Sequence, residues 1–281
     1  MFRRLGLVLP PLLTLLVVTV PATAASRPVV VAHRGASADA PENTLSALAL
    51  ASRFGADMVE VDVRETRDHA LVLMHDTTLT RTTDAESVFP RRAPWRVADF
   101  TLAEIRRLDA GSWFGRAGRG QRVPTLREAL RAMSGSGLGL LLEIKEPRLY
   151  PGIEARVAGE LRRAPSWPAA GRLVVQSFDW GSMRRFARLM PSPAIGLLGT
   201  PSAADLPALA GFAGQVNPPY QDVTPEYVRL VHRHGMRVFA WAVDDPGDIQ
   251  RMISGGVDGV ITNRPAVARS VLQDDASRRA A

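Results

Sequence analysis

Two acidic side chains share one face of an apolar segment near the start of the chain. Residues 59–63 alternate valine with acid, so on a strand Glu60 and Asp62 point to the same side. Two buried carboxylates repel each other and lose hydration, unless a cation lies between them. A second apolar run, at residues 29–32, ends in His33-Arg34-Gly35. A histidine, an arginine and a cation site at strand ends indicate chemistry on a phosphate.

The single lysine of the chain lies in another acidic strand. Lys145 follows Glu143 at a spacing of two, so the two side chains share one strand face, and Leu142 and Ile144 take the other. Every other basic residue is arginine, whose planar fork differs from the compact ammonium of lysine. We interpret the pair as a third carboxylate with a phosphate-binding ammonium. The alternative is a simple Glu–Lys ion pair.

Strand and helix patterns alternate after residue 27, which predicts a parallel sheet covered by helices. At this length the commonest closed form is the (β/α)8 TIM barrel. We predict strands at residues 29–32, 58–63, 71–74, 140–145, 173–177, 194–198, 215–217, 238–243 and 259–262. These are nine candidates for eight places, and the short 215–217 segment could be irregular. The link from 63 to 71 is too short for a helix, which leaves an extended return or a hairpin.

Residues 77–122 interrupt the alternation of strands and helices. We interpret them as a small insertion after the third strand, placed to cover a site. Within it, Thr101 and Glu104 form a capping-box pattern, and Thr125 with Glu128 forms another where regularity returns. Function in a barrel lies at the carboxyl ends of strands. We therefore expect one mouth to gather the polar residues at those ends, which are His33, Asp62, His75, Lys145, Gln176 and Asn263.

The first residues have the pattern of a secretory signal peptide, predicted over 1–24. Arg3 and Arg4 precede an apolar run, and Ala22-Thr23-Ala24 resembles a cleavage site. A retained membrane anchor is the alternative. The predicted barrel spans 27–272, and a flexible tail is expected over 273–281. No cysteine is present, which excludes thiolate-bound zinc and thiol catalysis.

The net charge is +7, and removing two signal-peptide arginines leaves +5. Because the arginines show no compact run with interleaved aromatics, we expect no nucleic-acid partner. An arginine-biased composition explains most of the charge, although a basic surface also favours phosphate esters or anionic lipid.

Several motifs together resemble the glycerophosphodiester phosphodiesterase family, over about residues 29–268. The motifs, in chain order, are His33-Arg34-Gly35, Pro41-Glu42-Asn43-Thr44, Glu60-Val61-Asp62, His75-Asp76, Leu142-Glu143-Ile144-Lys145, Gln176-Ser177-Phe178, Trp241, and Asp258-Gly259-Val260-Ile261-Thr262-Asn263-Arg264-Pro265.

This resemblance implies hydrolysis of glycerophosphodiesters to glycerol 3-phosphate and an alcohol in a TIM barrel with an insertion after the third strand. It also implies the roles of the site residues. Glu60, Asp62 and Glu143 would bind a divalent cation, Ca²⁺ or Mg²⁺. His33 and His75 would act as acid and base, in an order that the sequence does not fix. Arg34 and Lys145 would hold the phosphate.

Other residues receive weaker expectations. Glu42, Phe178 and Trp241 are candidate pocket residues, with Glu42 either orienting a neighbour or starting a helix. Asn263 stands where many family members carry aspartate, and we assign it no role. Catalysis is not expected of the remaining histidines, which are His69, His232 and His234.

Three other functions remain as alternatives. A lipid phosphodiesterase of the sphingomyelinase D or lysophospholipase D type would use the same metal site. A glycoside hydrolase would use Glu60 and Glu143 without metal. A barrel that only binds its ligand is the third. The expected partner is a small glycerophosphodiester, and the signal peptide indicates a secreted or periplasmic protein without a stable membrane anchor. The oligomeric state stays open.

Overall fold

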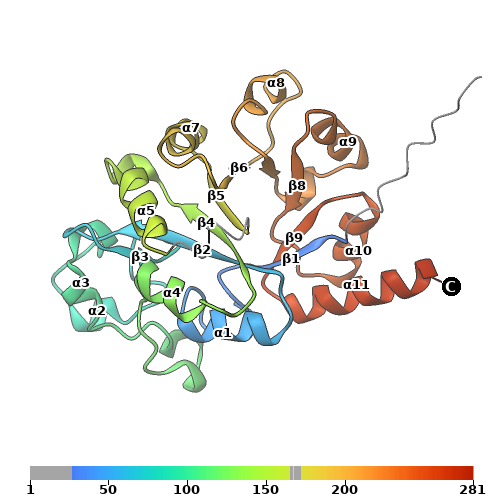
Figure 1. Cartoon of the computed structure of the whole chain (residues 1–281). Coiled ribbons are helices and arrows are strands. Elements are labelled where there is room, and N and C mark those ends of the chain that lie inside the picture. The colour runs from blue at the N-terminus through green and yellow to red at the C-terminus, as the bar shows by residue number, and fades with distance from the viewer. Residues whose placement is uncertain (1–26, 165–166, 168–171, 281) are drawn as a thin grey trace, which may run out of the picture.

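Helices surround a closed barrel of parallel strands in the computed structural model, which describes residues 27–164, 167 and 172–280 (Figure 1). The predicted signal peptide lies outside these ranges. The strands are β1 (Val29–Ala32), β2 (Met58–Glu65), β3 (Leu71–Leu73), β4 (Gly139–Ile144), β5 (Leu173–Ser177), β6 (Ala194–Leu198), β7 (Gln215–Asn217), β8 (Arg237–Ala240) and β9 (Gly259–Thr262). The helices are α1 (Leu45–Arg53), α2 (Ala85–Val88), α3 (Leu102–Ile105), α4 (Leu126–Ala132), α5 (Ile153–Arg162), α7 (Trp180–Leu189), α8 (Leu206–Leu209), α9 (Pro225–Arg233), α10 (Pro246–Ser254) and α11 (Pro265–Ala280).

The barrel closes in the order β1-β9-β8-β7-β6-β5-β4-β2, because β1 and β2 also pair in parallel. The TIM barrel prediction is therefore confirmed. The short 215–217 segment is a regular strand of this barrel. The ninth strand, β3, pairs antiparallel with β2 and is not one of the barrel strands, so the short link from β2 is a hairpin. The insertion thus follows the third strand of the chain, which is outside the barrel.

Side chains that point into the barrel form an apolar layer below a polar one. Met58, Leu141 and Phe239 belong to the buried cluster inside the barrel. Two residues further along β2 and β4, the same inward face carries Glu60 and Glu143. The opposite faces of these strands pack valine and leucine against the helices. Strand alternation therefore places the acids at the carboxyl ends of the strands, above a packed floor.

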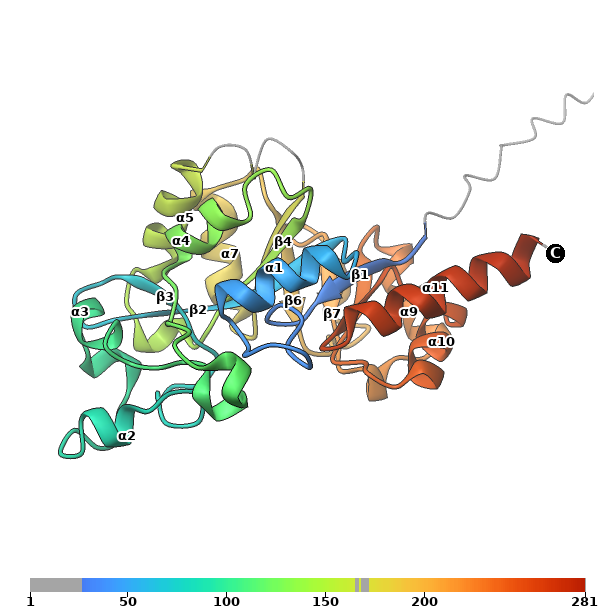
Figure 2. The same ribbon diagram turned by 90° about the horizontal axis from the view of Figure 1, so that it is seen from below.

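The insertion has an apolar core of its own. Phe100 and Leu108 are fully buried in a cluster that also includes Val72 of β3. Both predicted capping boxes form, at Thr101–Glu104 and Thr125–Glu128. Figure 2 shows α2 and the green segment after α3 at the lower edge of the molecule. The green segment packs against the loop after β1, because a Cβ on Gly118 would lie 2.8 Å from Pro41. The insertion therefore flanks the mouth of the barrel.

The carboxyl-terminal residues differ from the expectation of a flexible tail over 273–281. Helix α11 continues to Ala280, and its last turns are bonded to α10. The Gln250 side chain donates to Asp275 at 2.9 Å and accepts from Arg278 at 2.6 Å. Leu272 of α11 is buried, and α10 and α11 pack against each other, which extends α11 beyond the predicted boundary.

Gly259 supports the floor of the barrel, because it faces the ring of Phe239. A Cβ at position 259 would lie 2.7 Å from that ring. We predict that Gly259→Ala lowers the free energy of unfolding by roughly 1–3 kcal/mol, as overpacking does elsewhere. Denaturant unfolding would measure it, with Gly214→Ala as control, since a Cβ there meets nothing within 4 Å. Equal stability of the two variants would contradict this account of the floor.

Candidate active site

Three buried carboxylates meet at the mouth of the barrel. Glu60 and Asp62 come from β2 and Glu143 from β4, and the register of the two strands places Asp62 beside Glu143. One oxygen of each lies within 4.8 Å of the others, and all three residues are buried. The structure thus brings together the three residues that the sequence analysis proposed as cation ligands.

The loop after β1 wraps over these acids. The backbone N–H of Arg34 donates to Glu60 at 2.8 Å, and its Nε lies 3.3 Å from Asp62. The amide of Asn43 donates to Asp62 Oδ2 at 2.8 Å. Arg34 and Asn43 both adopt left-handed backbone, with φ of 57°. Left-handed backbone is uncommon in residues other than glycine. Its presence at two positions indicates a loop shaped for these contacts rather than for stability.

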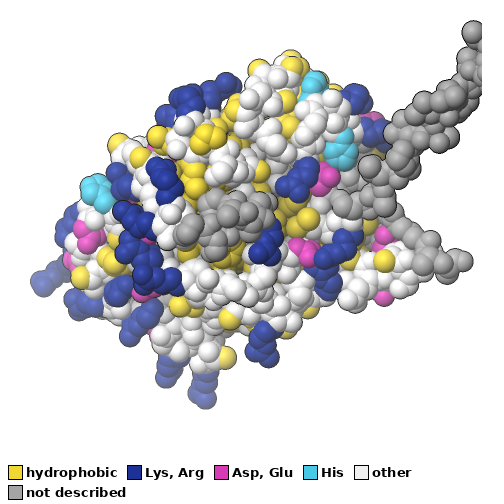
Figure 3. Space-filling view, viewed as in Figure 1, with side chains coloured by type: hydrophobic (Ala, Val, Ile, Leu, Met, Phe, Trp, Pro, Cys, Tyr) yellow, Lys and Arg dark blue, Asp and Glu magenta, His cyan; other side chains and the backbone are white. Residues whose placement is uncertain are grey.

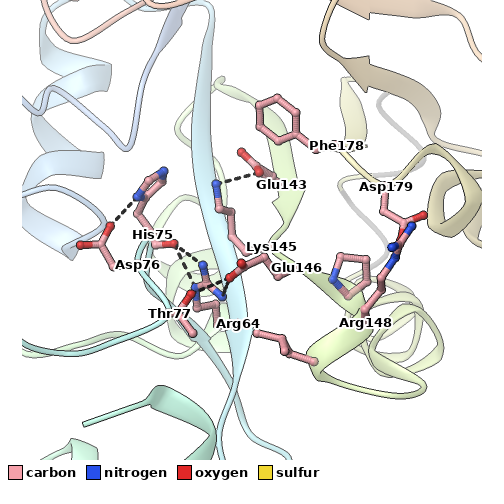
Figure 4. Close-up of a pocket in the computed structure, with 12 residues that line it drawn as sticks. Arg64, His75, Asp76, Thr77, Glu143, Lys145, Glu146, Arg148, Phe178 and Asp179 are labelled. Atoms are coloured by element: carbon pink, nitrogen blue, oxygen red, sulfur yellow. Dashed lines mark hydrogen bonds and ion pairs between the residues drawn. The ribbon is translucent and has the colours of Figure 1, made fainter. Parts of the chain in front are cut away.

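Lys145 approaches the acids from β4. Its Nζ lies 2.8 Å from Glu143 (Figure 4). The same atom lies 3.7 Å from Asp62. Burial acts to lower the pKa of this ammonium, but the negative charges of Glu143 and Asp62 raise it by more. The pKa of Lys145 is therefore above its usual range. Lys145 therefore remains charged at the edge of the acidic cluster.

The electrostatics of the cluster fit a divalent cation. Burial and the nearby Asp62 raise the pKa of Glu60 well above normal and that of Glu143 to about 7. Burial also acts to raise the pKa of Asp62, but Arg34 and Lys145 outweigh it and lower that pKa to about 2. In addition, Asp62 Oδ1 is buried without a hydrogen-bond donor. This oxygen has no donor, and too little positive charge surrounds the neighbouring Glu60 and Glu143 to keep their pKa values normal. Such a site is suited to a hard cation.

His33 is held by a chain of side chains from the end of β9. Its Nδ1 lies 2.8 Å from the amide oxygen of Asn263, which also accepts from Ser37. The amide nitrogen of Asn263 donates to Asp244 at 2.6 Å. Because that amide is oriented by Asp244, Nδ1 of His33 carries the hydrogen and Nε2 is left free for proton transfer. Burial lowers the pKa of His33 to about 4.

His75 has a carboxylate in the corresponding place. Its Nδ1 lies 2.6 Å from Asp76, which again leaves Nε2 free. Burial lowers the pKa of His75, although Asp76 opposes that effect. The two imidazoles thus share one geometry but differ in partner: a neutral amide for His33 and an anion for His75.

Arg81, from the insertion, joins the two sides of the site. Its guanidinium donates to both oxygens of Asp76, at 2.6 and 3.1 Å, and to both oxygens of Glu42, at 2.9 and 2.7 Å. Glu42 in turn accepts from Arg34 at 2.9 Å. A continuous path of charged contacts therefore runs from His75 to Arg34. Glu42 orients an arginine and stands before α1, whose N-cap is Thr44.

A cavity of about 770 Å³ opens beside Lys145 (Figure 4). His75, Glu143 and Lys145 form its inner wall, and Leu149 and Phe178 form an exposed apolar part of its rim. The ring of Trp241 packs edge-on to Phe178 at 5.8 Å, and its indole N–H donates to the Asn217 carbonyl. Of the two candidate aromatic residues, Phe178 thus lines the cavity and Trp241 supports it.

Comparisons with known proteins agree with this geometry. Residues 33–267 match the model of the glycerophosphoryl diester phosphodiesterase family. A glycerophosphodiester phosphodiesterase of Caldanaerobacter subterraneus is 38% identical over 239 residues, covering 84% of this chain and 94% of the relative. One from Bacillus subtilis is 34% identical over 258 residues, covering 86% and 85%. The chain belongs to the glycerophosphoryl diester phosphodiesterase family.

A solved structure supports the same family fold. A phosphodiesterase from Oleispira antarctica, determined with its product sn-glycerol 3-phosphate, superimposes with a TM-score of 0.77 at 31% identity. The match covers 88% of this chain and 97% of that one. The family match and the structural match therefore both cover most of the barrel.

Two of the other histidines pair with acids outside the carboxylate cluster. His69 contacts Glu65 at the β2–β3 turn, and His232 contacts Asp258, which precedes β9. The sequence analysis did not identify Arg81, Asp244 or the role of Asn263. Their signals were weak, because arginine is frequent in this chain and Asn263 lies 230 residues from the histidine that it orients.

We predict that Arg81→Gln lowers kcat/KM on glycerophosphocholine roughly 10- to 100-fold, since small displacements of catalytic groups have effects of this size. The reason is that Asp76 and Glu42 would lose their shared partner, and His75 and Arg34 would lose their orientation. Arg81→Lys should recover only part of the loss, because an ammonium cannot bridge two carboxylates in the same way.

The matched control is Arg91→Gln, an exposed arginine of the same insertion. It should keep wild-type kinetics, and both variants should keep the wild-type thermal midpoint within a few degrees. Normal turnover in Arg81→Gln would show that the ion-pair path has no part in catalysis.

Proposed function

We propose that this protein hydrolyses glycerophosphodiesters to sn-glycerol 3-phosphate and an alcohol, with a divalent cation bound at the mouth of the barrel. The observation that carries the proposal is the buried group of Glu60, Asp62 and Glu143 beside two imidazoles with free Nε2 atoms. Family membership and the product complex of the Oleispira relative support the same reaction.

Three carboxylates are ligands that Ca²⁺ and Mg²⁺ prefer, and we propose one of these ions. When bound, the cation neutralises the charge that builds on the phosphoryl oxygens. The chain's own cations complete the phosphate site. Arg34 and Lys145 each border the acidic cluster, and Lys145 also lines the cavity. Both remain charged at neutral pH, so they attract and orient the diester.

The two histidines have different hydrogen-bond partners, and we use this difference to assign the proton acceptor and the proton donor. Asp76 gives a proton on His75 a counter-charge, whereas the neutral amide of Asn263 gives His33 a hydrogen bond without charge. We therefore assign His33 as the base that accepts a proton from the attacking hydroxyl. His75 is the acid that protonates the departing alkoxide. The attacking hydroxyl is either the glycerol 2-hydroxyl, which gives a cyclic phosphate that water then opens, or water itself.

The lipid-directed alternative has no specific support, because the relatives that match nearly full length act, by their names, on glycerophosphodiesters. A glycoside hydrolase needs two carboxylates and no metal. The third carboxylate and the oxygen of Asp62 without a donor favour the cation instead. Finally, we propose export of the mature chain, on the signal-peptide pattern of residues 1–24.

Product analysis tests the reaction. With glycerophosphocholine, we predict release of glycerol 3-phosphate and choline, loss of activity in chelator, and recovery with Ca²⁺ or Mg²⁺. Glu143→Gln should weaken activation by the cation by at least roughly tenfold, because it removes one charged ligand. Full activity in chelator would exclude the cation mechanism, and release of phosphocholine would show that the wrong ester bond breaks.

The leaving group tests the assignment of acid and base. His75→Ala should lower turnover of glycerophosphocholine roughly 10²–10⁴-fold. It should lower turnover of the 4-nitrophenyl ester of glycerol 3-phosphate far less, since nitrophenolate leaves without a proton. His33→Ala should impair both substrates alike. The opposite pattern would exchange the two roles.

A further inference from the structure

Exposed apolar side chains are concentrated at the mouth of the barrel. Among the described residues, six large apolar side chains are exposed, and five follow the carboxyl ends of strands. Phe178 comes directly after β5, Leu149 lies in the loop after β4, and Leu45 begins α1 after the loop that follows β1. Trp113 and Phe114 belong to the insertion after β3, whereas Leu189 ends α7 at the opposite end of the barrel. Exposed apolar side chains gathered at one end of a fold are typical of interaction surfaces.

The segment from residue 111 to 120, which we call the aromatic loop, presents two of these side chains together. Trp113 is 41% exposed and Phe114 36%, and their rings meet edge-on at 5.6 Å. The indole N–H donates to the Ala110 carbonyl at 3.0 Å. The polar atom of the indole is therefore satisfied, and what remains for a partner is apolar ring surface.

The aromatic loop is built to hold its shape. The carboxylate of Asp109 accepts the backbone N–H groups of Gly111, Ser112 and Gly120, at 2.7–2.8 Å. Gly111 and Gly118 pack against each other so closely that a Cβ on the former would lie 1.9 Å from the carbonyl of the latter. The exposed rings are thus presented by an ordered loop, and binding would cost little further ordering.

Positive charge accompanies the rings without balancing acids. Arg116 and Arg119 are exposed, and within the described part of the chain their side chains have no hydrogen bond or ion pair. Across the mouth, Arg148 beside Leu149 is 87% exposed, although it contacts Asp179. The rim therefore combines apolar surface with cations, which is the composition that an anionic membrane surface attracts.

Basic surface elsewhere on the molecule differs in this respect. Figure 3 shows Lys and Arg side chains gathered at the left of the view of Figure 1, where α4 and α5 lie. On those helices Arg127 pairs with Glu160 at 2.6 Å, and Arg156 pairs with Glu65 at 2.6 Å. These charges are already compensated within the protein. Arg116 and Arg119 of the aromatic loop have no such acid beside them among the described residues, so their charge is available to an anionic partner.

We propose that the aromatic loop docks the mouth of the barrel on the surface of an anionic bilayer. Trp113 and Phe114 would enter the interfacial region, and Arg116 and Arg119 would contact anionic headgroups. The contact we propose is peripheral. No helix in the described part of the chain has the length and apolar content needed to span a membrane. Docking would hold the active site beside the layer from which glycerophosphodiesters arise by removal of acyl chains.

Co-sedimentation with vesicles tests the proposal without catalysis. Vesicles of phosphatidylcholine and phosphatidylglycerol should bind the mature protein, and vesicles of phosphatidylcholine alone should bind much less. The double variant Trp113→Ala/Phe114→Ala should lower partitioning at least roughly tenfold. Arg116→Glu/Arg119→Glu should lower it by at least about fivefold per arginine, and the wild-type binding should weaken as salt rises.

Matched controls come from the opposite end of the barrel. Leu189→Ala removes a side chain that is 46% exposed at the end of α7. Arg53→Glu/Arg162→Glu reverses two exposed charges at the ends of α1 and α5. Both controls should bind vesicles as the wild type does. Absence of vesicle binding by the wild type, or equal losses in test and control variants, would overturn the proposal.

Two further measurements distinguish membrane docking from a catalytic defect and from self-association. Turnover of soluble glycerophosphocholine without vesicles should be unchanged in the aromatic-loop variants, so failure of docking and failure of the proposed reaction are distinguishable. Sedimentation equilibrium of the wild type would detect a second copy bound at the same surface. A dimer that the aromatic double substitution dissociates, together with no vesicle binding, would replace the membrane by a second copy of the chain.

Discussion

The site depends on holding three carboxylates close together although their negative charges repel one another. Glu60, Asp62 and Glu143 are buried, and their mutual repulsion and loss of hydration are large compared with typical folding free energies. Arg34 and Lys145 compensate only part of this charge, as the raised pKa values of Glu60 and Glu143 show. The remaining deficit is what makes the cluster a receptor for a cation rather than a closed ion-pair network.

The barrel makes this concentration of charge tolerable. Parallel strands place β2 and β4 side by side in a fixed register, and alternation turns every second side chain inward. The apolar floor around Phe239 carries the packing, so the layer above it is free to serve chemistry. The same division explains why the loop after β1 adopts strained backbone at Arg34 and Asn43. Its hydrogen bonds to Glu60 and Asp62 orient the acids, and the floor supplies the stability.

Short-range pattern was enough to predict the barrel and the residues that line its mouth. Period-two alternation places Glu60 beside Asp62 and Glu143 beside Lys145, and strand ends place His33 and His75 near them. The pattern did not decide the hairpin that puts β3 outside the barrel, because an extended return and a hairpin have the same length. Nor did it predict the full length of α11, which depends on contacts between Gln250 and two residues far along the chain.

The residues that sequence reasoning missed share a physical cause. Arg81 and Asn263 act through partners that are distant in sequence, and neither touches the carboxylate cluster itself. Their importance appears only when two loops meet. Asn263 shows the consequence most clearly, because an aspartate at this position would give His33 an anionic partner like that of His75. The amide instead makes the surroundings of the two imidazoles unequal, and our assignment of one base and one acid rests on this inequality.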